Sequence, residues 1–244
     1  MLKEGFQTLT VPKSGTYSFE VIGAASSYDS IGARINGKIR LEQGNKITVA
    51  LGQQSKGCYR SGSGATFVVK ETGNRPEPLF VAAGASFSKP DFDYGRASLA
   101  QTAHGNEKIG SSGIQKFQSG EEENFFCAGA GFLEAPNAGR LNDKSVPPQS
   151  YSQGLMGGKG YSNNDDGVEL EGGFGGGGAS YHRKVDGGWK VHYGCGGGYT
   201  GGSSRIRDGQ FREGGGGGSF AADSSAIFDH KYEDYGKCTI KFLN

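Results

Sequence analysis

The chain has 244 residues, of which 46 are glycine, nearly three times the average share of about 7%. A formal net charge of +1 excludes the strong electrostatic attraction by which proteins bind nucleic acids or acidic membrane surfaces. The aromatic content of 11% argues against a disordered chain, and the absence of a strict Gly-X-Y repeat excludes collagen.

The N-terminal part of the chain predicts strands. Residues 16–22 alternate apolar and polar side chains, the two-residue period of a half-buried strand. Asn36-Gly37 lies between two further alternating runs and predicts a two-residue hairpin, because both turn positions need positive φ. Residues 46–51 predict another strand, and the polar residues 53–63 predict a loop.

Residues 65–70 and 79–83 are the next predicted strand pair. A turn signal at Gly73-Asn74 separates them, and the two prolines that follow it are expected to end the pairing. Both runs are apolar on both faces, so we expect them to be buried on both sides. Residues 84–170 show no sustained period and are expected to be connecting loops.

The glycine-rich stretch 172–218 has two interpretations. It is either a flexible linker or a bundle of polyglycine helices of the polyproline II type, in which glycine at every third position lets neighbouring backbones approach closely. Aromatic residues stand at the edges of the glycine runs, which favours the bundle. Such helices make no internal hydrogen bonds, so their backbone groups must pair with neighbouring segments. The glycines expected to hold this packing are Gly172, Gly175, Gly178, Gly198 and Gly201.

The end of the chain predicts a strand that closes the fold. Residues 219–230 have the pattern of a loop leading into a strand, and Cys238, Ile240 and Phe242 then alternate with polar residues. A terminal strand this regular is expected to pair with the N-terminal strands. The predicted organisation is a β-sandwich of residues 1–55 and 219–244 with a glycine-rich domain, residues 56–218, inserted between them and strands 65–70 and 79–83 shared.

The residues that carry chemistry in other proteins do not form a motif. The four cysteines, Cys58, Cys127, Cys195 and Cys238, contain no Cys-x-x-Cys pair, so we expect no zinc site. They allow two disulfides, in any of three connectivities, or four buried thiols. The glycine runs lack the lysine of a phosphate-binding loop, and no Gly-x-Ser-x-Gly elbow is present. We therefore expect no cofactor and no catalytic site.

Two metal-site candidates have simpler interpretations. His182 and His192 flank a predicted turn at 186–188 and are placed to face each other across a hairpin, either as a metal pair or, as we favour, as two exposed side chains. The acidic segment 163–171 offers oxygen ligands but does not match a calcium loop, and a polar turn is the favoured interpretation.

One loop between glycine runs is the predicted contact surface. It combines tyrosine and arginine, residue types that dominate binding hot spots. The alternative is a solvated loop whose aromatic side chains cover the glycine bundle. The predicted ligand-binding residues are Tyr199, Arg205, Arg207, Asp208, Phe211, Arg212 and Glu213.

A family resemblance spans almost the whole chain. The segments LTVPKSGTYSFEVIGAA, ITVALGQQ, GSGATFVVK, EPLFVAAG, GGFGGGG, GCGGGYTGG and GKCTIKFL occur in the order in which similar segments occur in the membrane-proximal ectodomain of the anaplastic lymphoma kinase and leukocyte tyrosine kinase receptors. GQQ and GGFGGGG are the more specific of these. Single glycine runs occur in many unrelated proteins.

The resemblance implies an all-β fold, a tumour-necrosis-factor-like jelly-roll sandwich with an inserted bundle of polyglycine helices. It implies an extracellular module that binds a cytokine-like protein and is dimerised by that ligand, with a tyrosine kinase elsewhere in the parent receptor. In the family the corresponding loop is acidic and faces a basic ligand, whereas here it carries Arg205, Arg207 and Arg212.

A second function class uses the same architecture. Polyglycine bundles resemble phage tail-fibre adhesin tips and glycine-rich surface proteins of protists, in which the loops contact a host surface. This hypothesis places the protein on a virion or microbial surface. The absence of Asn-x-Ser/Thr sequons and of an apolar leader in the first residues favours it, while the order of the strand motifs favours the receptor. A purely structural cross-linker is the third hypothesis.

Overall fold

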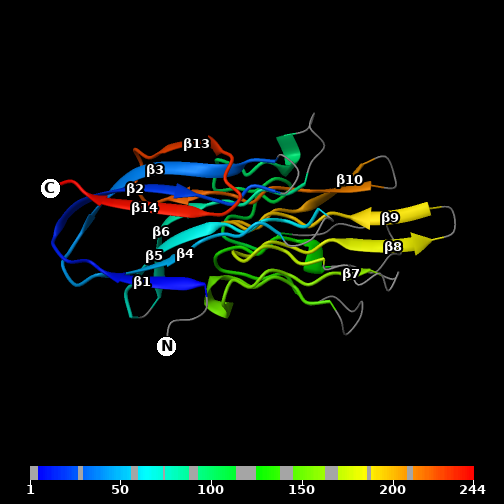
Figure 1. The fold of residues 1–244 in the computed structure, drawn as a ribbon, viewed down its shortest axis with the longest axis horizontal. Helices are drawn as coiled ribbons and strands as arrows, with labels where there is room; N and C mark the ends of the chain where they lie inside the picture. The colour runs from blue at the N-terminus through cyan, green and yellow to red at the C-terminus, as the bar shows by residue number, and fades with distance from the viewer. Residues whose placement is uncertain are drawn as a thin grey trace.

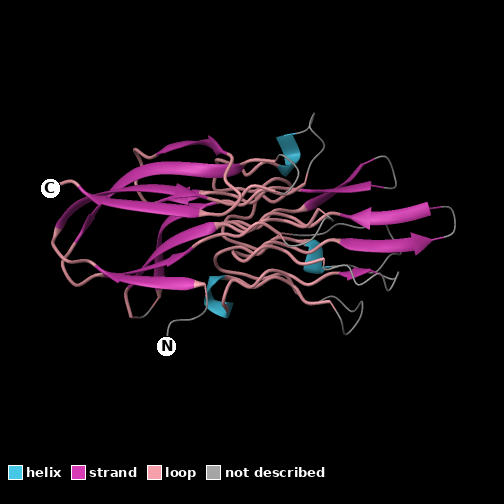
Figure 2. Cartoon of the chain, in the orientation of Figure 1, coloured by secondary structure: helices cyan, strands magenta, loops and turns pink. Residues whose placement is uncertain are grey.

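The computed structural model of the chain is built from strands and extended segments (Figure 2). This confirms an all-β fold. Helical structure in the described residues is limited to single 3-10 turns: η1 (Asp93–Gly95), η2 (Phe125–Cys127) and η3 (Tyr151–Gln153). The structure describes residues 5–26, 30–55, 60–73, 75–87, 93–113, 125–137, 145–162, 170–185, 188–207 and 211–244.

The strands form three sheets, of which two pack face to face at one end of the molecule and the third lies at the other end (Figure 1). The central sheet is antiparallel and has the order β1 (Phe6–Thr10), β4 (Lys46–Ala50), β5 (Thr66–Glu71), β6 (Pro76–Ala82) and β12 (Phe220–Ala221). The outer sheet has the order β13 (Ile227–Lys231), β3 (Gly32–Leu41), β2 (Gly15–Ile22) and β14 (Lys237–Phe242). The distal sheet has the order β10 (Ser204–Arg207), β11 (Phe211–Gly214), β9 (Gly188–His192), β8 (Tyr181–Val185) and β7 (Tyr161–Ser162).

The predicted closing strand is confirmed. β14 pairs antiparallel with β2, from Lys237 opposite Ile22 to Phe242 opposite Tyr17. The regular alternation of β14 allows one face to contact the core while the other stays solvated. The last strand therefore joins the outer sheet beside β2, whereas the first strand, β1, belongs to the central sheet.

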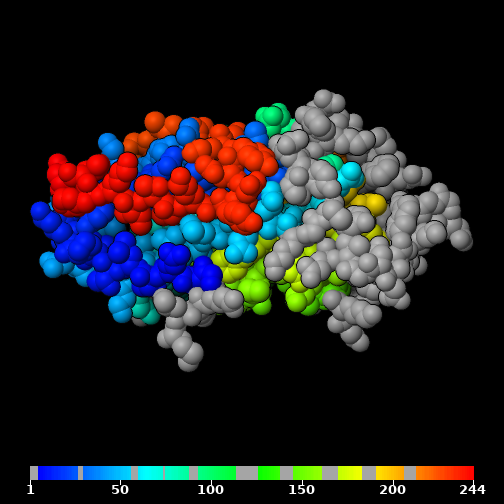
Figure 3. All heavy atoms as spheres, viewed as in Figure 1, coloured from blue at the N-terminus to red at the C-terminus, as the bar shows by residue number. Residues whose placement is uncertain are grey.

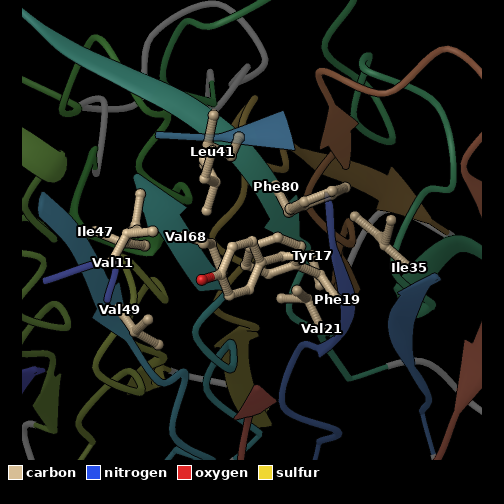
Figure 4. Packing of buried hydrophobic residues seen from close by; sticks show 12 residues of the cluster. Val11, Tyr17, Phe19, Val21, Ile35, Leu41, Ile47, Val49, Val68 and Phe80 are labelled. Carbon is tan, nitrogen blue, oxygen red and sulfur yellow. The ribbon is translucent and has the colours of Figure 1, made fainter. Parts of the chain in front are cut away.

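The main core lies between the outer and central sheets (Figure 4). The inward residues of β2, Tyr17, Phe19 and Val21, are almost completely buried, as their alternation predicts. Phe19 packs against Phe80 of β6, with ring centroids 5.0 Å apart. Burial of these apolar side chains on facing sheets is the dominant favourable contribution to folding here.

The predicted hairpin at Asn36-Gly37 is wrong, because both residues lie inside the continuous strand β3. Gly37 pairs with Phe19 across the sheet. A Cβ on Gly37 would come within 2.5 Å of the Phe80 ring. Glycine is needed at this position to make room for an aromatic ring, not to form a turn.

The prediction that the prolines end the β5–β6 pairing is also wrong. Pro76 lies opposite Glu71 and Pro78 opposite Val69, after a register shift between Val68 and Val69. On its other side β6 is paired with β12 only through Phe80 and Val81. The prolines therefore lie where this edge is open, and an open edge tolerates a missing N–H donor.

A second core covers the opposite face of the central sheet. Phe67 and Val81 point into it, and they meet Phe132, Tyr151 and Phe174 from the glycine-rich part of the chain. Residues 66–69 of β5 and 79–82 of β6 are thus buried on both faces, as predicted. They fall within residues 56–218, the predicted insertion, yet they form the middle of the central sheet.

Extended glycine-rich segments connect the central sheet to the distal sheet. Their backbone groups bond to other segments: Gly62 N–H donates to Gly178 O (2.8 Å) and Gly129 N–H donates to Gly202 O (3.0 Å). This is the inter-segment pairing that the bundle interpretation requires. A linker has no such partners, so the linker interpretation does not apply to these residues.

The spacing of Gly172, Gly175 and Gly178 does not reflect one continuous helix. Gly175 has φ 103° and Gly176 has φ 82°, far from the polyproline II region, and Gly177 N–H donates to Gly173 O at 3.0 Å. The chain therefore reverses here. The segments before and after this reversal pack closely: a Cβ on Gly172 would overlap the carbonyl group of Gly177.

The alternative of two disulfides is wrong, because Cys195 and Cys238 are free thiols. Burial raises the pKa of each of them to about 12. Cys127 is buried, and Cys58 lies outside the described residues. None of the helices described is long and apolar enough to cross a membrane.

Candidate functional site: the β10–β11 hairpin

The predicted contact loop forms the β10–β11 hairpin of the distal sheet. Arg205 lies opposite Glu213, Ile206 opposite Arg212, and Arg207 opposite Phe211. The distal sheet lies at the end of the molecule opposite the C-terminus (Figure 1). The hairpin turn, which contains Asp208, lies outside the described residues.

The base of the hairpin is held by an ion pair. Arg205 donates to Glu213 Oε2 from Nε at 2.9 Å and from Nη2 at 2.8 Å. The Glu213 side chain is only 5% exposed, whereas that of Arg205 is 45% exposed. Burial of a carboxylate is costly unless it is paired and hydrogen-bonded, and Arg205 supplies a cationic partner to Glu213.

Tyr94 fixes the other side of Arg205. The guanidinium lies 4.0 Å from the centre of the Tyr94 ring, within the range of a cation–π contact. The Tyr94 hydroxyl donates to Ser203 O at 2.9 Å, immediately before β10. η1, which carries Tyr94, thereby positions the start of the hairpin.

Burial keeps the neighbouring aromatic side chains neutral. It raises the pKa of Tyr94, and it lowers the pKa of His104, whose ring centroid is 5.5 Å from that of Tyr94. The positive charge of Arg205 lowers the pKa of His104 further. The base of the hairpin therefore holds the Arg205–Glu213 pair among uncharged rings.

The structure separates the predicted contact residues into groups. Tyr199 stacks on Phe220 and Phe132, with ring centroids 4.5 and 5.9 Å apart, and so packs beside the second core. Arg205 and Glu213 form the hairpin base. Arg207, Phe211 and Arg212 lie on the two strands next to the turn, and their side-chain positions are outside the description.

Sequence reasoning missed Tyr94 and Ser203. Tyr94 lies in the segment 84–170, for which no element was predicted, and nothing in its local sequence relates it to Arg205. Only the folded glycine segments bring η1 beside β10. Ser203 contributes a backbone oxygen, which has no side-chain signature in the sequence.

His182 and His192 do not face each other. In the β8–β9 hairpin, His182 lies opposite Val191 and Tyr181 lies opposite His192, so the two imidazoles project from opposite faces. Both side chains are buried, at 9% and 5% exposed, so the expectation of exposed histidines is wrong as well. In the part of the chain that the structure describes, no three His, Cys, Asp or Glu side chains come together to hold a metal ion. Most of the acidic segment, residues 163–169, lies outside the described residues.

A groove of about 430 Å³ lies on the solvent face of the outer sheet, away from the distal hairpin. Two carboxylates line it, those of Glu20 and Asp223, and each interacts with a neighbouring group. Glu20 forms ion pairs with Arg34 (3.8 Å) and Lys231 (4.0 Å), and Asp223 accepts a hydrogen bond from the Lys38 N–H at 2.8 Å. Both carboxylates that line the groove are therefore held by neighbouring groups.

We expect Arg205→Glu to lower the free energy of unfolding by about 2–3 kcal/mol, because it removes the cation and places a second carboxylate beside buried Glu213. Urea unfolding of the purified chain measures this. The matched control is Arg40→Glu, because Arg40 pairs with Glu42 at 3.5 Å on the open surface and its side chain is 75% exposed. The control should cost less than about 1 kcal/mol. Equal losses would show that the base pair does not anchor the hairpin.

No family model and no curated protein sequence matches this chain.

Proposed function

We propose that this chain is an extracellular recognition module that binds a protein ligand through the β10–β11 hairpin. The proposal joins the resemblance to the anaplastic lymphoma kinase and leukocyte tyrosine kinase receptors with the geometry of the distal sheet. Under this proposal the sandwich formed by the outer and central sheets is the tumour-necrosis-factor-like part. The glycine segments are the polyglycine bundle that carries the distal hairpins.

The packing of the glycine segments supports a rigid platform. A Cβ on Gly129 would overlap the carbonyl oxygen of Gly196, and a Cβ on Gly201 would overlap that of Gly129. Backbones in such contact leave little room for movement. A rigid base reduces the conformational entropy lost when a displayed loop binds its partner.

The observation that carries the proposal is the anchored base of the hairpin. Arg205 and Glu213 are used in holding the hairpin to η1, and Tyr199 is used in packing. Arg207 and Arg212 lie beyond this base, on facing strands. They give the end of the hairpin a positive charge, which fits a ligand with an acidic surface.

The test is Arg207→Glu combined with Arg212→Glu. We expect this pair of changes to weaken ligand binding by at least about tenfold and to leave thermal unfolding unchanged, because neither residue belongs to the anchored base. The probes are an array of purified secreted proteins and suspensions of intact bacterial and animal cells, with binding measured by fluorescence of the labelled chain.

The matched control is Lys38→Glu combined with Lys241→Glu, the same change of charge on the outer sheet. It should leave binding unaltered. Binding to a secreted protein that is lost only in the hairpin variant supports the receptor-like function. Binding to cells alone supports the host-surface adhesin instead, and binding that both variants retain places the contact elsewhere.

A further inference from the structure

The backbone of His104 connects both ends of the β10–β11 hairpin to the rest of the molecule. Its carbonyl oxygen accepts a hydrogen bond from Ser203 N–H at 3.0 Å, immediately before β10. Its N–H donates to Gly216 O at 3.2 Å, two residues after β11. Gly216 N–H in turn donates to Tyr94 O of η1 at 3.0 Å. A displacement of His104 would therefore disturb both ends of the hairpin at once.

The imidazole of His104 lies close to a positive charge that is held in place. Its ring centroid is 5.5 Å from that of Tyr94, and the Arg205 guanidinium lies 4.0 Å from the centre of the same Tyr94 ring. Arg205 is also paired with the buried carboxylate of Glu213. The guanidinium can move away from a new positive charge on His104 only by giving up these two contacts. Protonation of the imidazole would therefore place two cations around one aromatic ring.

A pocket of about 220 Å³ gives solvent access to this imidazole. It is lined by His104, by residues 96–99 and Asp93, and by His230 of β13. The Asp93 side chain is 81% exposed, so the pocket opens to water. Figure 3 shows the segment that carries η1, in green, at the surface of the molecule. The half-buried imidazole can thus exchange a proton with solvent without unfolding of the chain.

The groups around His104 disfavour its charged form. Burial lowers the pKa of His104 and the charge of Arg205 lowers it further, whereas Asp93 acts in the opposite direction. The effect of Asp93 is screened by water and shared with Arg96, with which it pairs at 3.0 Å. The titratable and charged groups that face His104 from η1 and the residue after it, from β10 and β11, and from β13 are, among the described residues, Asp93, Tyr94, Arg96, Arg205, Glu213 and His230.

We propose that His104 is an acid-sensitive switch for the position of the β10–β11 hairpin. The neutral imidazole keeps the base of the hairpin against η1, and protonation of the imidazole detaches it. His104 binds a proton less readily in this arrangement than when its side chain is solvated, so proton uptake favours the detached state. The inference concerns the position of the hairpin and holds whether or not the hairpin binds the ligand proposed above.

The direction of the effect sets the pH range in which it appears. The pKa of His104 is lowered in the attached state, so attachment is strongest above the ordinary imidazole pKa of about 6.5 and weakens as the pH falls below it. Solvated carboxylates take up protons near pH 4. A change between about pH 7.5 and pH 5 therefore reports on histidines.

Hydrogen exchange followed by NMR tests the proposal at the two hydrogen bonds that His104 makes. We expect the protection factors of the Ser203 and His104 amides to fall at least about fivefold between pH 7.5 and pH 5, because the open state becomes more populated. The protection factor compares each amide with an unstructured chain at the same pH, so it is corrected for the intrinsic exchange rate. Gly23 N–H, which donates to Ala33 O at 2.9 Å, should keep its protection.

His104→Phe is the matched variant, because it keeps a ring beside Tyr94 and both backbone hydrogen bonds but cannot take up a proton. The protection of the Ser203 amide should then be the same at both pH values. His104→Gln also removes the proton and should abolish the pH dependence even if loss of the ring lowers stability. His230→Gln, on the same pocket, should retain the pH dependence, because burial and Arg205 act on His104 more strongly than His230 does.

The competing explanation is protonation of the other buried histidines of the distal sheet, His182 and His192. A loss of Ser203 protection that persists in both His104→Phe and His104→Gln would assign the acid response to them. A wild-type chain whose Ser203 protection is the same at both pH values would show that protonation of His104 does not detach the hairpin. Either result overturns the proposal.

Discussion

Replacing Gly201 with alanine should lower the free energy of unfolding by about 3 kcal/mol or more, although the change adds one methyl group. The added Cβ would overlap the carbonyl oxygen of Gly129 and come within 2.5 Å of its carbonyl carbon. That oxygen already accepts a hydrogen bond from Gly113 N–H at 2.8 Å. The backbone of Gly129 therefore cannot move aside without breaking a bond to a third segment. Thermal unfolding should show the loss as a decrease of roughly 10 °C in Tm.

Gly44→Ala is the matched control for this substitution. Gly44 has φ 86°, so alanine there is strained, but no atom lies within 4 Å of the position of its Cβ. Its cost is therefore only conformational, about 1 kcal/mol. If Gly201→Ala costs no more than Gly44→Ala, the glycine segments are loosely packed, and a rigid platform for the distal hairpins would lose its physical basis.

The strands were predictable because their signal is local. The alternation in β2 and β14 depends only on which side chains face the core, and the structure pairs these two strands as expected. Gly37 shows where the same reasoning fails. Asn-Gly is a turn signal when no other constraint acts, but the Phe80 ring beneath β3 also requires glycine. The sequence carries no mark that distinguishes these two uses.

The close backbone packing of the glycine-rich part was predictable from the sequence, but the course of its chain was not. Its composition indicates close backbone packing, and the structure has Gly62 bonded to Gly178. The three-residue spacing suggested one run through Gly175, whereas the positive φ of Gly175 and Gly176 reverses the chain there. Glycine accepts both conformations at similar cost, so its presence cannot specify which one is used.

The candidate site was predictable only for its residue types. Tyrosine and arginine between glycine runs pointed to the β10–β11 hairpin, but their roles differ there. Arg205 and Tyr199 face partners from distant segments, Tyr94 and Phe132, and both contribute to packing. Which arginine is anchored depends on contacts across the fold, and a single sequence does not contain them.

Replacing Phe67 with alanine should destabilise the whole chain by about 3–5 kcal/mol and shift one cooperative unfolding transition. Phe67 is fully buried in β5, on the face of the central sheet that meets the glycine-rich part. Its ring centroid lies 6.3 Å from that of Phe132 and 6.0 Å from that of Tyr151. The cavity left by the substitution would open between the sheet and these rings.

Phe80→Ala is the comparison that makes this result decisive. Phe80 is equally buried, but it points from β6 into the core shared with the outer sheet. Because β5 and β6 are neighbours with apolar side chains on both faces, loss of either core weakens the same sheet. We therefore expect both variants to lower a single Tm by similar amounts, measured by calorimetry and by far-UV circular dichroism. Two separate transitions, with Phe67→Ala shifting one and Phe80→Ala shifting the other, would instead show that the two cores on the faces of the central sheet unfold independently.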